Sequence, residues 1–441
     1  MSENDLPYMI MDADNHFTEP EWCFERYIDP SKKDLAIRWV TDPNGKRVQL
    51  FAGKPAKFHS DQVTFSKEEL DKMLGQDVAN LPGGDRATTG SHQPEGEAEL
   101  RVMPGLFLNR LNPLKGLSDE ERKELVNKFR HQAEAYGSRE LRLALMDEQG
   151  IETALMFPAA AHDIEYEFDT DIEALYANTR AFNRWMHEEV GYNVENRMFL
   201  PPYIPLADTE LAVKELEQCI ADGAPMIQFK SGHAHGGRDN PLGGRSIADP
   251  VFDPVWARIN EANIRVAVHL GGTDYAKYGA DWSEDPNTPF GDFDAFQWMM
   301  YWGDRPAQEL TAAMILHNLF GRFPNVKVCL AEMGTVWLPY TLRKMDHAFM
   351  MGRKAKWGTL KQRPSEIFRQ HFVIAPYPEE NVQRVVAEVG IEPIVFGSDF
   401  PHGEGLAYPG KYAAAQLSSF SDDDIRKIMR SNLANFLNLP V

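Results

Sequence analysis

The sequence predicts an α/β protein of the (β/α)8 TIM barrel class with a large insertion after the first strand. From residue 150 onward, short apolar runs alternate with stretches of helical length, and one further run lies at 9–14. Strands buried on both faces of a parallel sheet have such uninterrupted apolar runs, and eight strand–helix units are typical of this barrel. No G-x-G-x-x-G follows any run. A dinucleotide-binding sheet therefore has no support, although an open doubly wound sheet remains the alternative.

The expected elements follow in chain order. Strands are expected at about 9–14, 153–157, 198–203, 226–230, 266–269, 326–332, 371–374 and 394–399. Helices are expected at about 21–28, 170–190, 208–222, 250–263, 304–322, 338–348, 379–389 and 421–437. The active site of such a barrel lies at the C-terminal ends of its strands, so the residues at these ends are the candidates for chemistry.

The first part of the chain does not follow this alternation. We divide the chain into a first barrel strand and loop at 1–28, an insertion at 29–149 and the remainder of the barrel at 150–441. Apolar runs flank Asn44-Gly45, a dipeptide that predicts a β-hairpin. Ser118 and Glu121 have the spacing of a capping box, and a helix is expected over 118–149. We expect this insertion to form a cap over the barrel.

The composition argues against several classes of function. The chain has 46 basic and 66 acidic residues, a net charge of −20, and no long basic run, so nucleic acid is not an expected partner. Its three cysteines are widely spaced, which is typical of buried thiols in a reducing compartment. The N-terminus has no signal-peptide pattern, and no run reaches the roughly 18 apolar residues of a membrane span. We therefore expect a cytoplasmic protein that does not act on membranes.

Residues of metal-ligand type end several of the expected strands. Asp14 and His16 end the first strand and are two residues apart, so they leave an extended strand on one face. His269, Glu332 and Asp399 end later strands. Carboxylates and imidazoles are good ligands for Zn, Mn or Fe. Because packing alone gives no reason for such residues at so many strand ends, we predict a centre with one or two divalent ions.

Several motifs carry a resemblance to a known family. They are the Asp-x-Asp-x-His opening at 12–16, His269, the closing G-S-D-F-P-H at 397–402, and the stretches 323–328 and 432–437. Together they resemble the amidohydrolase-related family, in the branch of aminocarboxymuconate semialdehyde decarboxylase and the resorcylate-type decarboxylases. The resemblance covers most of 8–28 and 150–440. It implies a metal-dependent TIM barrel enzyme.

The resemblance also implies a ligand set and one departure from it. The implied metal ligands are Asp14, His16, His269 and Asp399. Asp399 is also expected to handle a proton, and His402 to orient it. Glu332 stands where the decarboxylases carry a histidine, which weakens a direct transfer of their mechanism. We interpret Glu332 as a general base or a further ligand, with a purely structural carboxylate as the alternative.

His317 raises the possibility of a second metal ion. It lies in an apolar helical stretch just before the sixth strand, where a histidine is more often a core residue. If it points inward, His317 and Glu332 would complete a ligand set too large for one catalytic Zn, which takes about three protein ligands. Two iron or manganese ions, and the non-heme di-iron oxygenase chemistry of some relatives, would then be possible.

The substrate residues are expected around the mouth of the barrel. Lys230 would bind a substrate carboxylate or pair with Glu332. His233 lies in a glycine-rich loop that contacts substrate or is plain surface. Trp298 and Trp302 belong to a long aromatic excursion after His269, which would line an apolar pocket.

The preferred function is hydrolysis of a hydrophobic or aromatic carboxylic acid derivative by a metal-bound water, with Asp399, Glu332 and His402 as catalytic residues. The alternatives are a di-iron oxygenase and a metal-dependent decarboxylase, because fold alone does not decide chemistry. A non-catalytic binding barrel is the alternative to any enzyme. The expected partner is a small-molecule substrate, and the resemblance implies a homodimer.

Overall fold

The computed structural model describes most of the chain. The described residues are 4–41, 47–56, 64–66, 86–88, 100–101, 103–158, 164–168, 170–235, 244–271, 275–285, 288, 293–301, 304–352 and 355–441. The turn of the predicted hairpin, at 42–46, and Trp302 lie outside them.

The strands confirm the predicted barrel class. Seven strands of the barrel are parallel, and hydrogen bonds join them in two runs, β1–β8–β10 and β11–β14–β15–β16. Their bounds are β1 Ile10–His16, β8 Ile151–Phe157, β10 Met198–Phe199, β11 Met226–Lys230, β14 Arg265–His269, β15 Val328–Ala331 and β16 Phe372–Ile374. The expected strand order is therefore present, with shorter strands than predicted in the third and sixth positions.

Two irregular segments close the ring between these runs. Next to β10, Tyr203 forms a parallel bridge with Gln228 of β11. The expected eighth strand is not a regular strand, but Ile394 bridges Ile374 of β16 and Phe400 bridges Asn15 of β1. Main-chain bonds from Ala13 N to Phe396 O (2.8 Å) and from Asp399 N to Asp14 O (2.7 Å) continue this contact. The segment 394–400 thus brings Asp399 to the end of β1.

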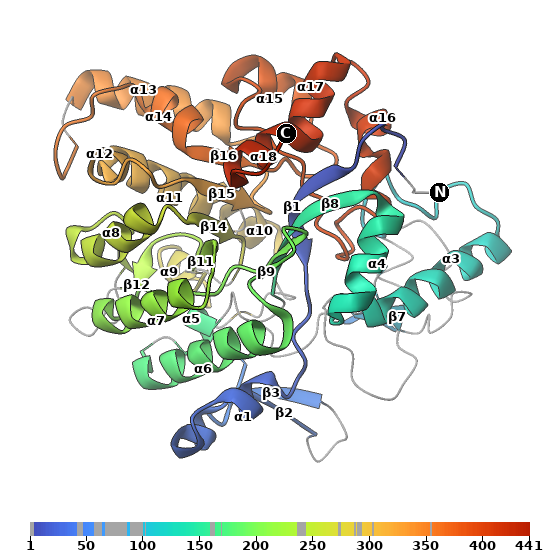
Figure 1. The fold of residues 1–441 in the computed structure, drawn as a ribbon, viewed down its shortest axis with the longest axis horizontal. Coiled ribbons are helices and arrows are strands. Elements are labelled where there is room, and N and C mark those ends of the chain that lie inside the picture. Colours follow the sequence, from blue (N-terminus) through green and yellow to red (C-terminus); the bar gives the residue numbers. More distant parts are fainter. Residues whose placement is uncertain are drawn as a thin grey trace.

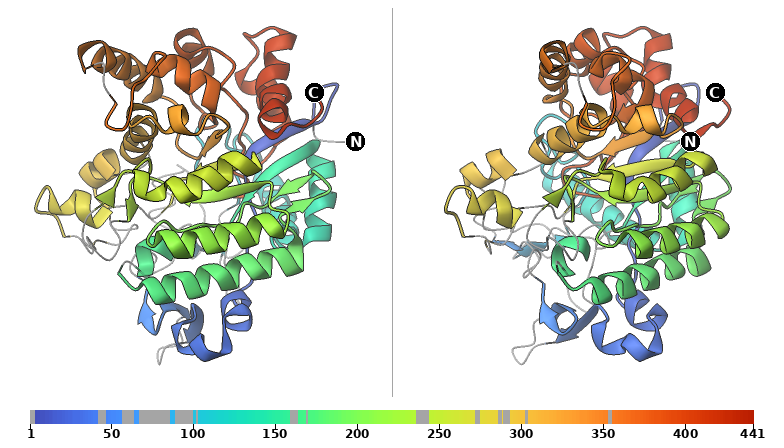
Figure 2. Two further views of the ribbon diagram at one scale, coloured as in Figure 1. Left: turned by 60° about the vertical axis from the view of Figure 1, so that its left-hand side comes forward. Right: turned by 90° about the vertical axis from the view of Figure 1, so that its left-hand side faces the viewer.

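Helices surround the strands on the outside of the barrel (Figure 1). The main ones are α5 Ile164–Phe168, α6 Ile172–Trp185, α7 Thr209–Ala221, α8 Asp253–Ala262, α11 Asp304–Leu316, α12 Leu319–Arg322, α13 Leu338–Gly352, α14 Pro364–His371, α15 Val382–Val389, α16 Tyr412–Gln416, α17 Asp422–Arg426 and α18 Asn432–Leu437. Two further helices, α9 Tyr275–Ala280 and α10 Ala295–Tyr301, project from the body at the left of both views in Figure 2. In the described part of the chain, no helix has the length and apolarity needed to cross a membrane.

Strand alternation separates two cores. On β11, Met226 belongs to the cluster inside the barrel, together with Ala267 and Cys329. Phe229 faces the helices, where its ring centroid lies 5.2 Å from that of Trp256. The inward face therefore carries small and apolar residues in the middle of the barrel, and polar side chains gather where the strands end.

The insertion contains a hairpin and two helices. The hairpin is confirmed by antiparallel β2 Arg38–Thr41 and β3 Arg47–Phe51, and it lies with α1 Cys23–Tyr27 beyond α6 (Figure 1). Short strands β4 Lys54–Pro55, β5 Thr64–Ser66, β6 Arg86–Thr88 and β7 Leu100–Arg101 follow. That the insertion covers the mouth of the barrel stays a prediction.

The helix expected over 118–149 is two helices. Ser118 and Glu121 form the predicted capping box of α3 Asp119–Gln132. The prediction of one continuous helix is wrong because Ser138 caps a second one, α4 Arg139–Gln149, by accepting a bond from Leu141 N. Gly137 precedes this cap in a non-helical conformation. The interruption turns α4 so that it leads directly into β8.

Candidate metal centre

The end of β1 is shaped by a register shift. Between Asp12 and Asn15 the pairing of β1 with β8 slips, as in a β-bulge, which changes the direction of the side chains around it. Gly397 lies against the same place, where a Cβ atom would come within 2.8 Å of Asp14 Cβ. The bulge and this close approach bring Asp14 and His16 beside the segment that carries Asp399.

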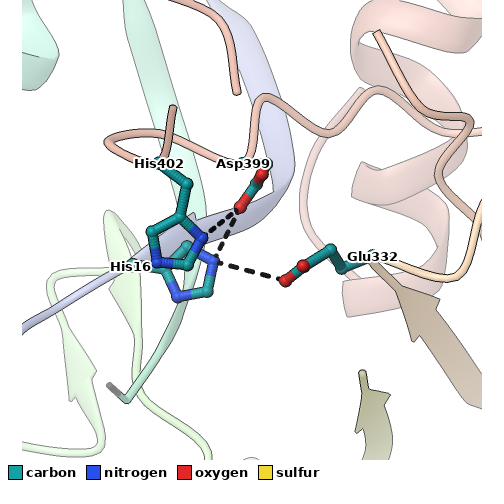
Figure 3. A group of neighbouring side chains, drawn as sticks. All are labelled: His16, Glu332, Asp399 and His402. Carbon is teal, nitrogen blue, oxygen red and sulfur yellow. Dashed lines mark hydrogen bonds and ion pairs between the residues drawn. The ribbon is translucent and has the colours of Figure 1, made fainter. Parts of the chain in front are cut away.

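Five of the predicted ligands converge in the structure. His16 Nε2 lies 3.0 Å from Asp399 Oδ1, 3.8 Å from Asp14 Oδ1 and 3.9 Å from Glu332 Oε2. His269 Nε2 lies 3.1 Å from Glu332 Oε2 and 3.4 Å from Asp14 Oδ1. Figure 3 shows Asp399 and Glu332 reaching His16 from two different segments of the chain. All five side chains are buried.

The two carboxylates from later strands share an unusual backbone conformation. Glu332 follows β15 with φ of 51°, and Asp399 has φ of 54°. Residues with a Cβ atom rarely adopt this left-handed region, and such strain concentrates at functional sites. A hydrogen bond of 3.0 Å from Tyr377 Oη to the carbonyl of Glu332 supports the first of these turns. The chain therefore holds both carboxylates against a local backbone preference.

Burial and like charge perturb the acids. Burial raises the pKa of Glu332, and burial together with the nearby Glu332 raises that of Asp399 well above its ordinary value, against the lowering effect of neighbouring imidazoles. Burial alone would lower the pKa of His269, yet Glu332 and Asp14 raise it well above the usual range. Carboxylates buried this close together are stable only with a cation or a proton among them.

The residues fit a divalent transition metal. Asp14 Oδ1 is buried and accepts no hydrogen bond from the described residues. His269 directs Nδ1 to the carbonyl of Leu270, and such a bond fixes the tautomer that leaves Nε2 available as a ligand. The donors are nitrogen and oxygen without sulfur, which suits Zn, Mn or Fe. Two groups in the described residues have the spacing of a metal site, and His16 belongs to both: Asp14, His16 and His269 form one, and His16, Glu332, Asp399 and His402 the other.

His402 lies at the edge of the cluster and contacts two of its members, Asp399 and His16. Its Nδ1 lies 2.8 Å from Asp399 Oδ1, and its side chain is 24% exposed. Its ring centroid lies 3.9 Å from that of His16, and Figure 3 shows the two rings next to each other. Burial lowers the pKa of His402, but Asp399 outweighs this effect and raises it to about 10. His402 therefore connects the buried carboxylate to the edge of the site.

His317 does not join the cluster, and the prediction that it is a metal ligand is wrong. Helix α11 ends at Leu316, and Asn318 turns the chain with φ of 61°. His317 Nδ1 lies 2.7 Å from Ser246 Oγ, and its ring packs edge-on against Trp357 at 5.0 Å. The His317 imidazole thus contacts Ser246 and Trp357 in the helix layer. The nitrogen ligand expected for a second ion is therefore not in the cluster.

The predicted substrate residues are less closely tied to the centre. Lys230 ends β11 beside His269 in the strand register and borders a small hollow with Glu165 and Ala234. His233 follows in the next loop, with Nδ1 3.2 Å from Ala234 O. Trp298 lies on α10, 41% exposed. Their roles in substrate binding stay predictions.

Sequence reasoning missed the polar residues that hold the predicted ligands in place. Asp12 Oδ1 accepts from Ser398 N at 2.9 Å and from Asp14 N at 3.1 Å. Asn15 Nδ2 donates to Asp12 Oδ2 at 2.9 Å. Asp12 and Ser398 belong to the motifs at 12–16 and 397–402, which could have indicated them. Arg142 of α4, which contacts Asn15, belongs to no motif.

With this geometry in hand, comparison with known proteins gives the family. The sequence model of the family described as Amidohydrolase matches residues 112–439, well over half of the chain. The chain belongs to the amidohydrolase family. A 2-amino-3-carboxymuconate-6-semialdehyde decarboxylase from Dictyostelium discoideum is 24% identical over 54% of this chain and 60% of its own length. A gamma-resorcylate decarboxylase from Polaromonas is 24% identical over 68% of this chain and 86% of its own.

Solved amidohydrolase structures agree on the fold. An amidohydrolase from Mycobacterium avium subsp. paratuberculosis is 28% identical, with a TM-score of 0.75 over 98% of this chain and 100% of that one. A dihydroxybenzoic acid decarboxylase from Polaromonas, which holds manganese and the inhibitor 2-nitroresorcinol, has a TM-score of 0.53 at 20% identity, over 74% of this chain and 92% of its own. The similarity to the first structure extends along nearly the whole chain, including the insertion.

Proposed function

We propose that this amidohydrolase is a metal-dependent carboxy-lyase that removes CO2 from an aromatic carboxylic acid. The observation that carries the proposal is the buried carboxylate Asp399, which contacts a ligand imidazole, His16, on one side and the partly exposed His402 on the other. Decarboxylation replaces CO2 by a proton, so it needs an acid that delivers a proton inside a closed site. The named relatives, which are decarboxylases, support this choice.

In the proposed site, Asp14, His16, His269 and Asp399 hold one divalent ion. Manganese is the first choice, because a related decarboxylase structure holds it. Such an ion supplies a Lewis acid that stabilises negative charge on a substrate oxygen. The carbonyl of Leu270 would orient His269 through Nδ1, and Glu332, which lies at the metal-binding Nε2, would face the ion or its bound water. Iron or zinc, the homodimer and the cytoplasmic location stay predictions.

The proton route uses the chain's own residues. Lys230 would pair with the substrate carboxylate. As the carbon–carboxylate bond breaks, its electron pair stays on the ring carbon and CO2 departs. Asp399 protonates that carbon and recovers a proton through His402 Nδ1. Every step conserves atoms and charge without an oxidant.

Hydrolysis is the second candidate, and Glu332 favours it. A carboxylate in this place, 3.1 Å from His269 Nε2, would serve as the general base for an attacking water. An aromatic ester or amide would then be the substrate. The oxygenase alternative required His317 as a ligand of a second ion, and His317 lies beside Ser246 instead.

Isotope labelling separates the two candidates. The manganese-loaded protein is incubated in D2O with a panel of hydroxylated and methoxylated benzoic acids, and the products are analysed by mass spectrometry. We expect CO2 release with one deuterium on the carbon that carried the carboxylate, and no turnover after chelation of the metal. A parallel assay uses esters and amides of the same acids in 18O-labelled water. Turnover of these compounds with incorporation of the labelled oxygen, without CO2 release from the acids, would instead establish hydrolysis.

A further inference from the structure

Arg142 is the largest charged side chain buried near the centre. It lies in the first turn of α4 and has no exposed surface. Burying an unpaired cation is costly, so a guanidinium in such a place is held by specific contacts. Burial lowers the pKa of Arg142 only to about 10, so it stays charged at neutral pH.

The contacts of Arg142 lie on the two segments that carry the ligands. Its Nη2 donates to His16 O at 2.6 Å and also to Asn15 Oδ1. Its guanidinium carbon lies 5.1 Å from the ring centroid of Phe400, the residue after Asp399. Arg142 thus touches the end of β1 and the closing segment at 394–400 at once.

A hydrogen-bond network extends these contacts around the bulge. Asn15 Oδ1, which accepts from Arg142, also accepts from His16 N at 3.1 Å. Asn15 Nδ2 donates to Asp12 Oδ2, which also accepts from Ser398 Oγ at 2.5 Å. Asn15 is adjacent to Asp14 and His16 in the chain, Ser398 is adjacent to Asp399, and Asp12 lies two residues before Asp14.

We propose that Arg142 is a positioning residue for the metal centre, which holds the bulge of β1 and the closing segment in the geometry that aims Asp14, His16 and Asp399 at one ion. Arg142 touches neither substrate nor metal. Its cation also interacts favourably with the buried carboxylate of Asp12, which accepts bonds from Asp14 N and Ser398 N. The inference rests on the metal centre of the proposed function.

Replacement of Arg142 tests the inference through metal binding. Arg142→Met keeps most of the side-chain volume and removes the charge and the donors. Loss of groups that orient metal ligands typically lowers affinity by about 10- to 100-fold. We expect a loss in that range for Mn2+, measured by chelator competition, and a broadened Mn2+ electron paramagnetic resonance signal that reports a less uniform ligand geometry. Arg142→Lys, which keeps the charge and one donor, should recover part of the affinity.

Arg265→Met is the matched control. Arg265 is buried to a similar degree and donates to main-chain carbonyls, but it begins β14, at the opposite end of the strand from His269. Arg265→Met should lower the stability of the protein and leave its affinity for Mn2+ and the Mn2+ resonance signal unchanged. If Arg142→Met does not fold, Asn15→Ala takes its place, with the same expected loss.

Two outcomes are distinguishable. Wild-type affinity and signal in folded Arg142→Met, or an equal loss in Arg265→Met, would overturn the positioning role alone. Failure of the wild-type protein to bind Mn2+ would overturn the proposed metal centre, and this inference with it.

Discussion

At the scale of single residues, the centre depends on side chains whose ordinary behaviour is altered by burial. Asp399 is held in a left-handed conformation and shares its Oδ1 between His16 and His402. A carboxylate placed among other acids is unfavourable unless a cation or a proton compensates it. In the proposed function, Asp399 is therefore the residue at which metal binding and proton transfer meet.

Asp399→Ala should therefore lose both properties. We expect metal content in the purified protein, measured by elemental analysis, to fall well below that of the wild type. Turnover should drop by at least the 10²- to 10⁴-fold that general acid catalysis typically contributes. The exposed Asp423→Ala, in the first turn of α17, serves as the control. Wild-type metal content in folded Asp399→Ala would remove Asp399 from the ligand set.

At the scale of elements, loops after the strands connect the insertion to the centre. The carboxylate of Glu379 accepts from the backbone N–H groups of Asn109, Arg110 and Leu111, in the insertion. The next residue, Glu380, accepts from Thr335 N at 2.9 Å, in the turn that follows Glu332. One loop thus holds the segment 109–111 on one side and the Glu332 turn on the other.

Glu379→Ala should loosen the segment 109–111. Several partly exposed backbone donors would lose their acceptor, and we expect a cost of about 1–3 kcal/mol in the free energy of unfolding. Limited proteolysis should cleave this region faster than in the wild type. Glu388→Ala, which removes an ion pair with the mostly exposed Arg343, should cost less, because surface ion pairs contribute little. Equal losses of stability in both variants would contradict the role of Glu379 in holding the segment 109–111.

At the scale of the whole molecule, buried neutral imidazoles link stability to pH. Burial lowers the pKa of His371 from 6.5, although a bond to Val326 O opposes this effect. His371 also packs on Phe320, with ring centroids 4.3 Å apart. Below about pH 6.5 the unfolded chain takes up the proton more readily than the folded chain. The contribution of His371 to stability is therefore present at neutral pH and is lost as the pH falls.

His371→Asn should remove this contribution, because its amide can keep the bond to Val326 O but does not titrate. We expect the difference in melting temperature between wild type and variant, measured in chelator, to favour the wild type at pH 7.5 and to shrink towards pH 5. The other histidines titrate in both proteins and cancel in this difference. Parallel curves would show that His371 titrates as in the unfolded chain.

The sequence by itself determined the barrel class, the strand order and the side chains that gather at the C-terminal ends of the strands. These follow from local rules, because a strand's apolar run predicts its burial and the C-terminal ends of parallel barrel strands meet at one face. Asp14, His16, His269, Glu332 and Asp399 end their strands and converge as predicted. Family membership followed from the same motifs.

Only the tertiary structure decided which residues outside the strands face the centre. The turn at Asn318 ends the helical stretch at His317 and leaves it beside Ser246, whereas Arg142, which no motif marked, meets the ligand segments. A helix can present any side to the barrel, and its rotation depends on how it packs against its neighbours. Residues on helices and long loops therefore acquire their roles from contacts distant in sequence, which no local pattern contains.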